Sequence, residues 1–561
     1  MLNPHAVELT WLVLLLPAAL WGLASGKHTR RQSTMGRVLI RISRKRHVAA
    51  ISVGLAALAI RAALLPIHPP PVPAIMDEYS YLLAADTFAS GRAANPAHSF
   101  WENFETFCVL SQPKYASKYP PAQGLVLAAG IVLAHSPWIG VWLSIGAMCA
   151  AIVWMLQGWL PPRWALLGGV LALLRIGFGS YWVDSYWGGA VAACGGALLY
   201  GALPRLMRRG NIRDGLILGA GLAILANSRP FEGLLISVPA MVALAVWAWR
   251  RGWPAVRPLS PMLALLGLTA LAMLSYDYAV TGSPWRMPYQ VHEAQYAVAP
   301  LFWVQKLRPE PVYHHAVMKA MWTGVARDVY LKNFRVGLVT ASLIKLKNLW
   351  SFFLGPLLTV PLIALPWALR SRRLRLIYIS LGVFLLGLMA EAEVLPHYAA
   401  PATALIYLTV VQSLRYLRAS GRVGLTSARS IPALLVLTVV GFYGLEAGGI
   451  TFLHELYSCY FTRPGNLERA RIATQLEETA GRHLVIVRYG AKHDPYEEWV
   501  YNRADIDGAK VVWAREMDAQ RNRALIEYFS PRQLWLLEPD EPHPALKAYG
   551  ERGGSLAKND R

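Results

Sequence analysis

Cysteine is scarce in this chain, and the pattern of its metal-binding residue types excludes a zinc site. Four cysteines occur among 561 residues, and no spacing of cysteine and histidine is typical of zinc ligands. Cys149 and Cys194 fall within apolar segments, whereas Cys108 and Cys459 fall in segments that the topology below places outside the membrane. A disulfide between Cys108 and Cys459 and a pair of unpaired thiols are the two alternatives.

Charged residues, and acidic ones above all, are also scarce. They make up 16% of the chain against 55% hydrophobic residues, which excludes an ordinary soluble protein. Lys and Arg outnumber Asp and Glu by 55 to 33, so the net charge is +22. Because the basic residues gather in short loops between apolar runs, they indicate cytoplasmic loops of a membrane protein and not a nucleic-acid partner.

Long apolar runs predict an α-helical polytopic membrane protein with about twelve spanning helices and no internal repeat. The first run, 7–23, precedes the basic segment 27–46, which contains no acidic residue. We therefore place this segment in the cytoplasm and the N-terminus outside. The second run, 48–67, leads outward to three consecutive prolines. The remaining runs lie near 138–158, 163–182, 188–204, 215–229, 233–250, 259–280, 350–369, 376–394, 399–416 and 431–449.

Two long loops, 68–137 and 282–348, and the C-terminal segment 455–561 are predicted on the outer face. The first loop is rich in Trp, Tyr, Phe and Pro, which favours short helices along the membrane surface. The C-terminal segment is polar, and its apolar periodicity predicts a small extracytoplasmic α/β domain. The sequence thus divides into an extra N-terminal helix with its basic loop (1–47), a membrane core (48–450) and this domain.

The unusual polar residues of the membrane part gather on the predicted outer side. Asp77 and Glu78 follow the second run, and Asp184 and Arg229 lie in the next two outer loops. His397 lies in a later one. Carboxylates that act as a base, beside cations that bind a phosphate, suit the transfer of a group from an anionic lipid carrier.

The arrangement of these residues resembles a known family. The pair Asp77-Glu78 directly follows an early core helix, and the long surface loop after it ends in Lys118-Tyr119-Pro120-Pro121. This layout resembles the membrane-embedded glycosyltransferases of the C-type fold, which include the protein O-mannosyltransferases and the lipid A aminoarabinose transferases. Asp184 at the tip of the next outer loop and the segment 396–401 also fit, and the resemblance covers roughly residues 48–450.

The resemblance implies transfer of a sugar from a polyprenyl-phosphate-linked donor to a hydroxyl on a lipid, protein or glycan acceptor, with inversion at the anomeric carbon. Asp77 would be the general base, which typically contributes ~10²–10⁴-fold to the rate. Glu78 would orient Asp77 or the acceptor. Lys118 and Arg229 would hold the carrier phosphate and stabilise its developing charge.

The resemblance also implies roles for three further residues. Tyr119, Asp184 and His397 would bind substrate or its phosphate. Some members of the family hold a divalent cation between carboxylates, and Asp77 with Asp184 are the residues that would bind Mg²⁺ or Mn²⁺ in this chain. The active site and the C-terminal domain would then lie on the periplasmic side of a cell inner membrane, beside the membrane lipids.

Each of these residues also has a plainer interpretation. The acidic pair would stabilise the start of the helix after it by ~0.3–1 kcal/mol through the helix dipole. Asp184 would be a solvated loop residue, Lys118 and Arg229 would lie beside lipid headgroups, and His397 would be a structural hydrogen-bonding residue.

Two other classes of protein remain as alternatives. A transporter or flippase of lipid-linked saccharides would place ionisable residues near the bilayer midplane, where Arg61 and Arg175 are the main candidates, and would often contain inverted repeats. A membrane scaffold would work through residues 455–561, but it leaves the polar outer loops unexplained. Acceptor binding is our hypothesis for the role of residues 455–561 in a glycosyltransferase.

Overall fold

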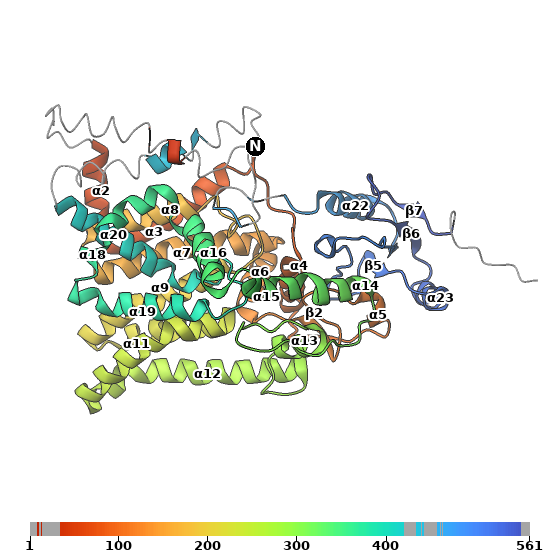
Figure 1. Ribbon diagram of the computed structural model, residues 1–561, viewed down its shortest axis with the longest axis horizontal. Helices are drawn as coiled ribbons and strands as arrows, with labels where there is room; N and C mark the ends of the chain where they lie inside the picture. Colours follow the sequence, from red (N-terminus) through yellow and green to blue (C-terminus); the bar gives the residue numbers. More distant parts are fainter. Residues whose placement is uncertain are drawn as a thin grey trace, which may run out of the picture.

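The computed structural model describes residues 8–10, 13, 34–419, 434–438, 440–441, 457–459, 462 and 464–550. A body of packed helices carries a smaller domain with a sheet at one end (Figure 1). The predicted spans 7–23 and 431–449 fall mostly outside the described residues, as do residues 27–33 of the basic segment.

Five helices among the described residues are long and apolar enough to cross a membrane. They are α3 (Arg46–Ala63), α7 (Pro137–Trp159), α9 (Gly189–Arg209), α11 (Pro230–Arg251) and α12 (Val256–Thr281), the last continuous with the short helix η1 (Trp253–Ala255). A sixth span results if α16 (Leu338–Phe353) and the helical segment Gly355–Ala368, bent by 99° to each other, count as one. The chain is therefore a multi-pass membrane protein, as its apolar runs predict.

The predicted number of about twelve spans is larger than the number of described helices that meet these criteria. Four predicted runs form helices of only 14 to 17 residues, namely α8 (Pro162–Ile176), α10 (Ile212–Ser228), α19 (Arg375–Leu388) and α20 (Thr403–Ala419). Glycine and proline account for two of these ends: Gly177 follows α8, and Arg229 stands between α10 and Pro230. A proline disfavours helical backbone at the residue before it. The apolar composition of a run does not show such an end, so it overestimates the length of the helix.

The helical body packs around α7, which contacts α3, α6 (Pro121–Ala134), α8 and α9. A close approach brings the segment after α19 against α9. A Cβ atom on Gly196 would lie 1.9 Å from the carbonyl oxygen of Pro401, in the short helix η5 (Ala400–Ala402). Only glycine permits this contact, and it fixes the outer loop that carries His397 beside the membrane helices.

The first predicted outer loop forms helices, as its aromatic and proline content predicts, and also a small sheet that the sequence did not predict. Its helices are α4 (Met76–Ala89) and α5 (Trp101–Phe104), and its strands are β1 (Asn95–Pro96), β2 (Val109–Leu110) and β3 (Lys114–Ser117). The strands form an antiparallel sheet in the order β1-β3-β2. The second outer loop contains α13 (Pro288–Tyr296), α14 (Ala316–Lys319), the π-helix η2 (Ala320–Val325) and α15 (Ala326–Arg335).

The C-terminal segment folds as the predicted α/β domain. Its helices and strands are α22 (Leu467–Glu478), β4 (His483–Val487), η6 (Pro495–Glu497), β5 (Val511–Arg515), α23 (Ala519–Tyr528), β6 (Gln533–Leu537) and β7 (Lys547–Ala548). The sheet order is β5-β4-β6-β7, with β4 parallel to both β5 and β6, and β7 antiparallel to β6. Apolar residues of β4 and β5 share one core with Leu83, Phe104 and Tyr115 of the first outer loop, so the domain is packed onto that loop.

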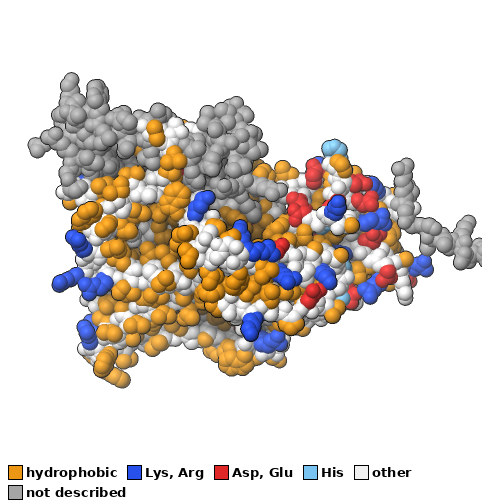
Figure 2. Space-filling model, viewed as in Figure 1, with side chains coloured by type: hydrophobic (Ala, Val, Ile, Leu, Met, Phe, Trp, Pro, Cys, Tyr) orange, Lys and Arg blue, Asp and Glu red, His pale blue; other side chains and the backbone are white. Residues whose placement is uncertain are grey.

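Charged side chains distribute unevenly over the molecule. Figure 2 shows apolar side chains over the helical body, and the acidic side chains gather on the C-terminal domain. Lys and Arg also lie at the end of the helical body that is opposite this domain (Figure 2). All four cysteines are free thiols, so of the two alternatives for Cys108 and Cys459 the structure contains the unpaired one.

Candidate active site

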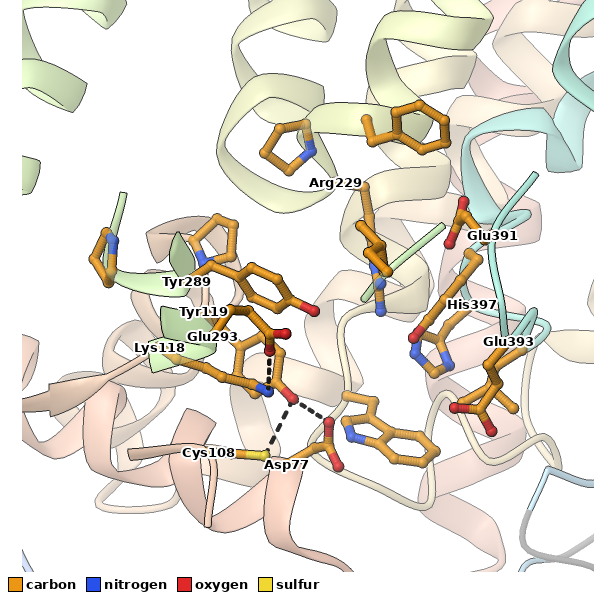
Figure 3. Close-up of a pocket in the computed structure, with 18 of the residues that line it drawn as sticks. Asp77, Cys108, Lys118, Tyr119, Arg229, Tyr289, Glu293, Glu391, Glu393 and His397 are labelled. Carbon is orange, nitrogen blue, oxygen red and sulfur yellow. Dashed lines mark hydrogen bonds and ion pairs between the residues drawn. The ribbon is translucent and has the colours of Figure 1, made fainter. Parts of the chain in front are cut away.

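A cavity of about 400 Å³ lies where the outer loops meet. Separate parts of the membrane region line it, among them the start of α4, the residues after β3, the junction of α10 and α11, the C-terminal part of α12 and the loop after α19. The second predicted outer loop, Tyr457 and Tyr496 complete the wall. Figure 3 shows Asp77, Lys118 and Glu293 on one side of this cavity and Glu391, Glu393 and His397 on the other.

Asp77 lies in the first turn of α4, and its carboxylate lines the cavity. It accepts a hydrogen bond from the Tyr119 hydroxyl, which comes from the far end of the first outer loop (Figure 3). Burial and, next, the charge of Asp77 raise the pKa of Tyr119 well above its usual value, so the hydroxyl stays protonated as a donor. The structure therefore holds Asp77 with a neutral partner, a state in which a carboxylate can accept a proton from a substrate.

Glu78, the neighbour of Asp77, lies outside the lining of the cavity. Its side chain is buried at 2% exposure, and its two oxygens accept backbone hydrogen bonds from Ala74 and Tyr186, each at 2.9 Å. Burial raises the pKa of Glu78 to about 7, although these two backbone N–H groups oppose the change. Glu78 thus joins the segment before α4 to the loop before α9, and it fixes the backbone that carries Asp77.

Lys118 lines the same cavity and is surrounded by aromatic rings. Its ammonium lies 5.0 Å from the Tyr289 ring and 5.6 Å from the Trp322 ring. The nearest carboxylate oxygen is Glu293 Oε1, at 3.8 Å. A cation held at this distance by one carboxylate and by ring faces retains N–H groups for an anionic ligand.

Arg229 stands at the junction of α10 and α11 and lines the opposite part of the cavity. Its Nη1 lies 3.4 Å from Glu232 Oε1, one turn along α11, and its guanidinium carbon lies 4.4 Å from the centre of the Tyr398 ring. Stacking on the ring and a long contact with one carboxylate leave the other edge of the guanidinium directed at the cavity (Figure 3).

The loop after α19 supplies His397 and two glutamates. His397 is buried, and its Nδ1 lies 2.9 Å from the Tyr181 hydroxyl. Burial and, next, the charge of Arg229 hold the pKa of His397 well below its usual range, so the imidazole is neutral. His397 lines the cavity but carries no charge with which to hold a phosphate.

Glu391 and Glu393 line the cavity on the same side as His397. Glu391 is 2% exposed, and its Oε1 has no hydrogen-bond partner among the described residues. Desolvation of the Glu393 carboxyl by the surrounding protein and, next, the charge of Asp77 raise its pKa. Two carboxylates therefore face the cavity from the side opposite Lys118.

Asp184 is not part of this arrangement. It lies outside the cavity lining and forms an ion pair with Arg61, whose Nη2 is 2.8 Å from Asp184 Oδ1. Among the described residues, no group of three or more His, Cys, Asp or Glu is placed to hold a metal ion. Asp77 and Asp184 therefore do not share the cavity wall, and a divalent cation between them stays a prediction.

Of the residues singled out in the sequence, Asp77, Lys118, Tyr119, Arg229 and His397 meet at one cavity. Sequence reasoning missed others that the structure adds to the wall, and among them are Tyr289, Glu293, Glu391, Glu393 and Tyr496. All five lie in predicted outer segments or close to His397 in the sequence, and this position was the one sign that they could belong to the site. Nothing in the sequence told which of the many polar residues of these segments would face inward.

Comparisons with known proteins show a likeness in structure only. No family model and no curated protein matches the sequence. ArnT from Cupriavidus metallidurans, in its apo state, is 13% identical, with a TM-score of 0.49, over 86% of this chain and 92% of that one. The same protein bound to undecaprenyl phosphate is 12% identical, with a TM-score of 0.46, over 91% and 94% of the two chains.

An oligosaccharyltransferase from Archaeoglobus fulgidus, tethered to an acceptor peptide, is 11% identical, with a TM-score of 0.46, over 78% of this chain. The present chain spans 61% of the length of that protein. The chain is thus similar in structure to these two membrane proteins, at low sequence identity. Since the TM-scores are below 0.5, the function proposed below rests on the cavity itself.

Proposed function

We propose that the protein is an integral-membrane glycosyltransferase. It would move a sugar from a polyprenyl-phosphate-linked donor to a hydroxyl acceptor, on the face of the membrane that carries the C-terminal domain. The observation that carries this proposal is the composition of one cavity: the Asp77 carboxylate, paired with a neutral hydroxyl, shares it with the two cations Lys118 and Arg229.

The two cations suit the phosphate of the donor. Lys118 and Arg229 come from opposite parts of the wall, and their carboxylate contacts are long, at 3.8 Å to Glu293 and 3.4 Å to Glu232. A phosphate between them would receive charge-assisted hydrogen bonds from both sides. These bonds would strengthen as the bond from the sugar to the phosphate breaks, because negative charge then develops on the phosphate oxygen.

A second cavity supports a lipid-linked donor. It has a volume of about 910 Å³, is lined mostly by apolar residues of α6, α7, α10 and α12, and shares Pro121, Asn227 and Tyr276 with the first cavity. An isoprenoid chain suits such a lining, since burial of apolar surface is favourable by roughly 25 cal/mol per Å². A donor with its phosphate between Lys118 and Arg229 would thus have a place for its tail.

Asp77 supplies the base. In the proposed step, the acceptor oxygen attacks the anomeric carbon, and its proton passes to the Asp77 carboxylate. The bond between the anomeric carbon and the phosphate oxygen breaks, and the polyprenyl phosphate leaves with the bonding electrons. Attack from the side opposite the leaving phosphate inverts the anomeric configuration.

The two arginines that favoured the transporter alternative have structural partners. Arg61 pairs with Asp184, and the Arg175 guanidinium pairs with Glu8. Each positive charge is therefore neutralised by the protein itself, and neither arginine lines the cavity. The charges that could bind a substrate lie at the outer loops, as catalysis at that face requires.

Release of polyprenyl phosphate tests the proposal. Purified protein in nanodiscs is incubated with a panel of polyprenyl-phosphate-linked sugars and a membrane extract as acceptor source, and released polyprenyl phosphate is measured by mass spectrometry. We expect release from at least one donor, with loss of release in Asp77→Asn. Asp328→Asn is the matched control, because Asp328 is exposed in the second outer loop and does not line the cavity. Equal release by Asp77→Asn and wild type would overturn the assignment.

A further inference from the structure

The folded part of the C-terminal domain reaches the cavity through Tyr496, which lies in the short helix η6. Tyr457, which precedes α22, also lines the cavity. Tyr496 is 48% exposed and lines the cavity, so its ring is not buried inside the domain. An exposed aromatic ring in a cavity wall is free to contact a ligand.

Hydrogen bonds and an ion pair within the C-terminal domain fix the backbone of the segment that carries Tyr496. The Asp494 side chain accepts a hydrogen bond from the backbone N–H of Tyr496 at 3.0 Å. Glu498 accepts from the backbone N–H groups of Trp499 and Val500, at 3.0 and 2.7 Å. Glu498 is buried together with Arg515, whose Nη2 lies 2.5 Å from it. The backbone that carries the Tyr496 ring is therefore fixed by contacts within the C-terminal domain.

The domain in turn is fastened to the helix that begins with Asp77. The Tyr501 ring stacks on the Tyr79 ring with 4.1 Å between their centres and 3° between their planes. The Arg469 guanidinium lies 4.8 Å from the centre of the same Tyr79 ring. Farther along α4, Asp86 Oδ2 accepts a hydrogen bond from the backbone N–H of Ala504 at 2.8 Å. These contacts fix Tyr496 relative to Asp77.

Tyr496 lies in the cavity wall near carboxylates. Burial, then Glu393, Asp494 and Asp77, raise the pKa of its hydroxyl. Of these carboxylates, Glu393 and Asp77 line the cavity from opposite sides, with Lys118 on the side of Asp77 (Figure 3). Beside Glu393 a phosphate would be repelled, and a neutral group with many hydroxyls would not.

We propose that Tyr496 and Glu393 form the acceptor subsite, and that the acceptor they bind is a sugar ring of a glycan or glycolipid. This inference rests on the function proposed above. A sugar ring offers an apolar C–H face to the tyrosine ring and hydroxyl donors to the Glu393 carboxylate. One of its hydroxyls then points toward Asp77, which removes the proton as the oxygen attacks. The C-terminal domain thereby selects the acceptor.

Steady-state kinetics with the full-length protein test this subsite. The acceptor is the glycan and glycolipid fraction of a membrane extract, varied in concentration, and the donor is the one identified by release of polyprenyl phosphate. We expect Tyr496→Ala to raise the KM for the acceptor about five- to tenfold and to leave the KM for the donor unchanged. Tyr496→Phe keeps the ring and should retain most of the affinity. Glu393→Gln should also raise the acceptor KM.

Lys492→Ala is the matched control, because Lys492 is exposed on the same loop and does not line the cavity. A thermal unfolding midpoint equal to that of wild type shows that each variant is folded. An unchanged acceptor KM in Tyr496→Ala overturns the subsite, as does transfer to peptide hydroxyls but not to the glycan fraction. The proposed function fails in a different way, namely when wild type releases no polyprenyl phosphate from any donor.

Discussion

Asp77 and Asp184 are carboxylates of two predicted outer loops in the same protein, and they differ in their access to the cavity and in the charge of their partners. Asp77 lines a cavity and accepts a hydrogen bond from the neutral hydroxyl of Tyr119. Asp184 lies outside that cavity and is paired at 2.8 Å with the buried guanidinium of Arg61. A base needs access to its substrate and freedom to accept a proton, and only Asp77 has both.

The difference teaches that a carboxylate at a membrane boundary can serve two purposes. Arg61 is 1% exposed and carries a charge that is costly to bury without a partner. Asp184 offsets that cost, and Arg61 also donates hydrogen bonds to the carbonyls of His68 and Pro69 at the end of its span. Asp184 thus stabilises the loop structure at the end of α3, whereas Asp77 lines the cavity and is the base of the proposed reaction.

Removing the base should have the largest effect. Asp77→Asn keeps the size and polarity of the side chain but cannot accept the proton, so we expect the transfer rate to fall by ~10²–10⁴-fold. The measurement is the initial rate of sugar transfer at saturating donor and acceptor. A loss smaller than tenfold in a folded variant would mean that another group is the base.

Removing a cation of the cavity should have the next largest effect. Lys118→Met keeps an unbranched side chain but loses the charge, so kcat/KM for the donor should fall about 10–100-fold, the worth of one hydrogen bond to a charged group. The kinetic assay is repeated over a range of donor concentrations. Lys114→Met is the control, because Lys114 is exposed in the same loop and does not line the cavity. The phosphate assignment is wrong if both variants behave alike.

Changing Glu78 should have a smaller effect on activity and a distinct effect on pH dependence. The pKa of Glu78 is about 7 in the folded protein against 4.5 as the usual value, so its ionisation opposes folding. This contribution makes stability fall as pH rises from about 4.5 to about 7, and Glu78→Gln should remove it. Activity should fall only a few-fold, because one of the two backbone N–H groups loses its acceptor.

The thermal unfolding midpoint of wild type and Glu78→Gln, measured between pH 4.5 and 8, gives the pH contribution as a difference between the two curves. Parallel curves would contradict the burial of a titrating carboxyl at this position.

Changing Asp184 should have the smallest effect on the chemistry. Asp184→Ala leaves the Arg61 charge buried without its carboxylate, so stability should fall by about 3–5 kcal/mol. The transfer rate per folded molecule should stay within about threefold of wild type, because Asp184 does not line the cavity. Denaturant unfolding gives the first quantity, and activity normalised to folded protein gives the second.

The fold was predictable from the sequence where the signal is local. Apolar runs and basic loops predicted a multi-pass helical protein, and periodicity predicted the α/β domain after it. The number of spans was not predictable, because composition does not reveal where α8 and α10 end or that α16 is followed by a bend of 99°. The ends of α8 and α10 lie at single residues, Gly177 and the residue before Pro230, to which the average composition of an apolar run is insensitive.

The candidate site was predictable only in part, for the same reason. Asp77 and Lys118 stand out because each is a charged residue at a predicted membrane boundary. The pairing of Asp184 with Arg61 joins residues 123 positions apart, so no local pattern reveals it. Glu393 and Tyr496 reach the cavity from separate loops, and only the packing of the C-terminal domain on α4 brings them together with Asp77.

The most direct test of the account compares Asp77→Asn with Asp184→Asn in one experiment. Single-turnover sugar transfer is measured at saturating donor, and each rate is divided by the fraction of folded protein. The account predicts a loss of at least a hundredfold for Asp77→Asn at an unchanged unfolding midpoint, and a near wild-type rate for Asp184→Asn at a lowered midpoint. Equal losses in the two variants, or a greater loss in Asp184→Asn, would contradict it.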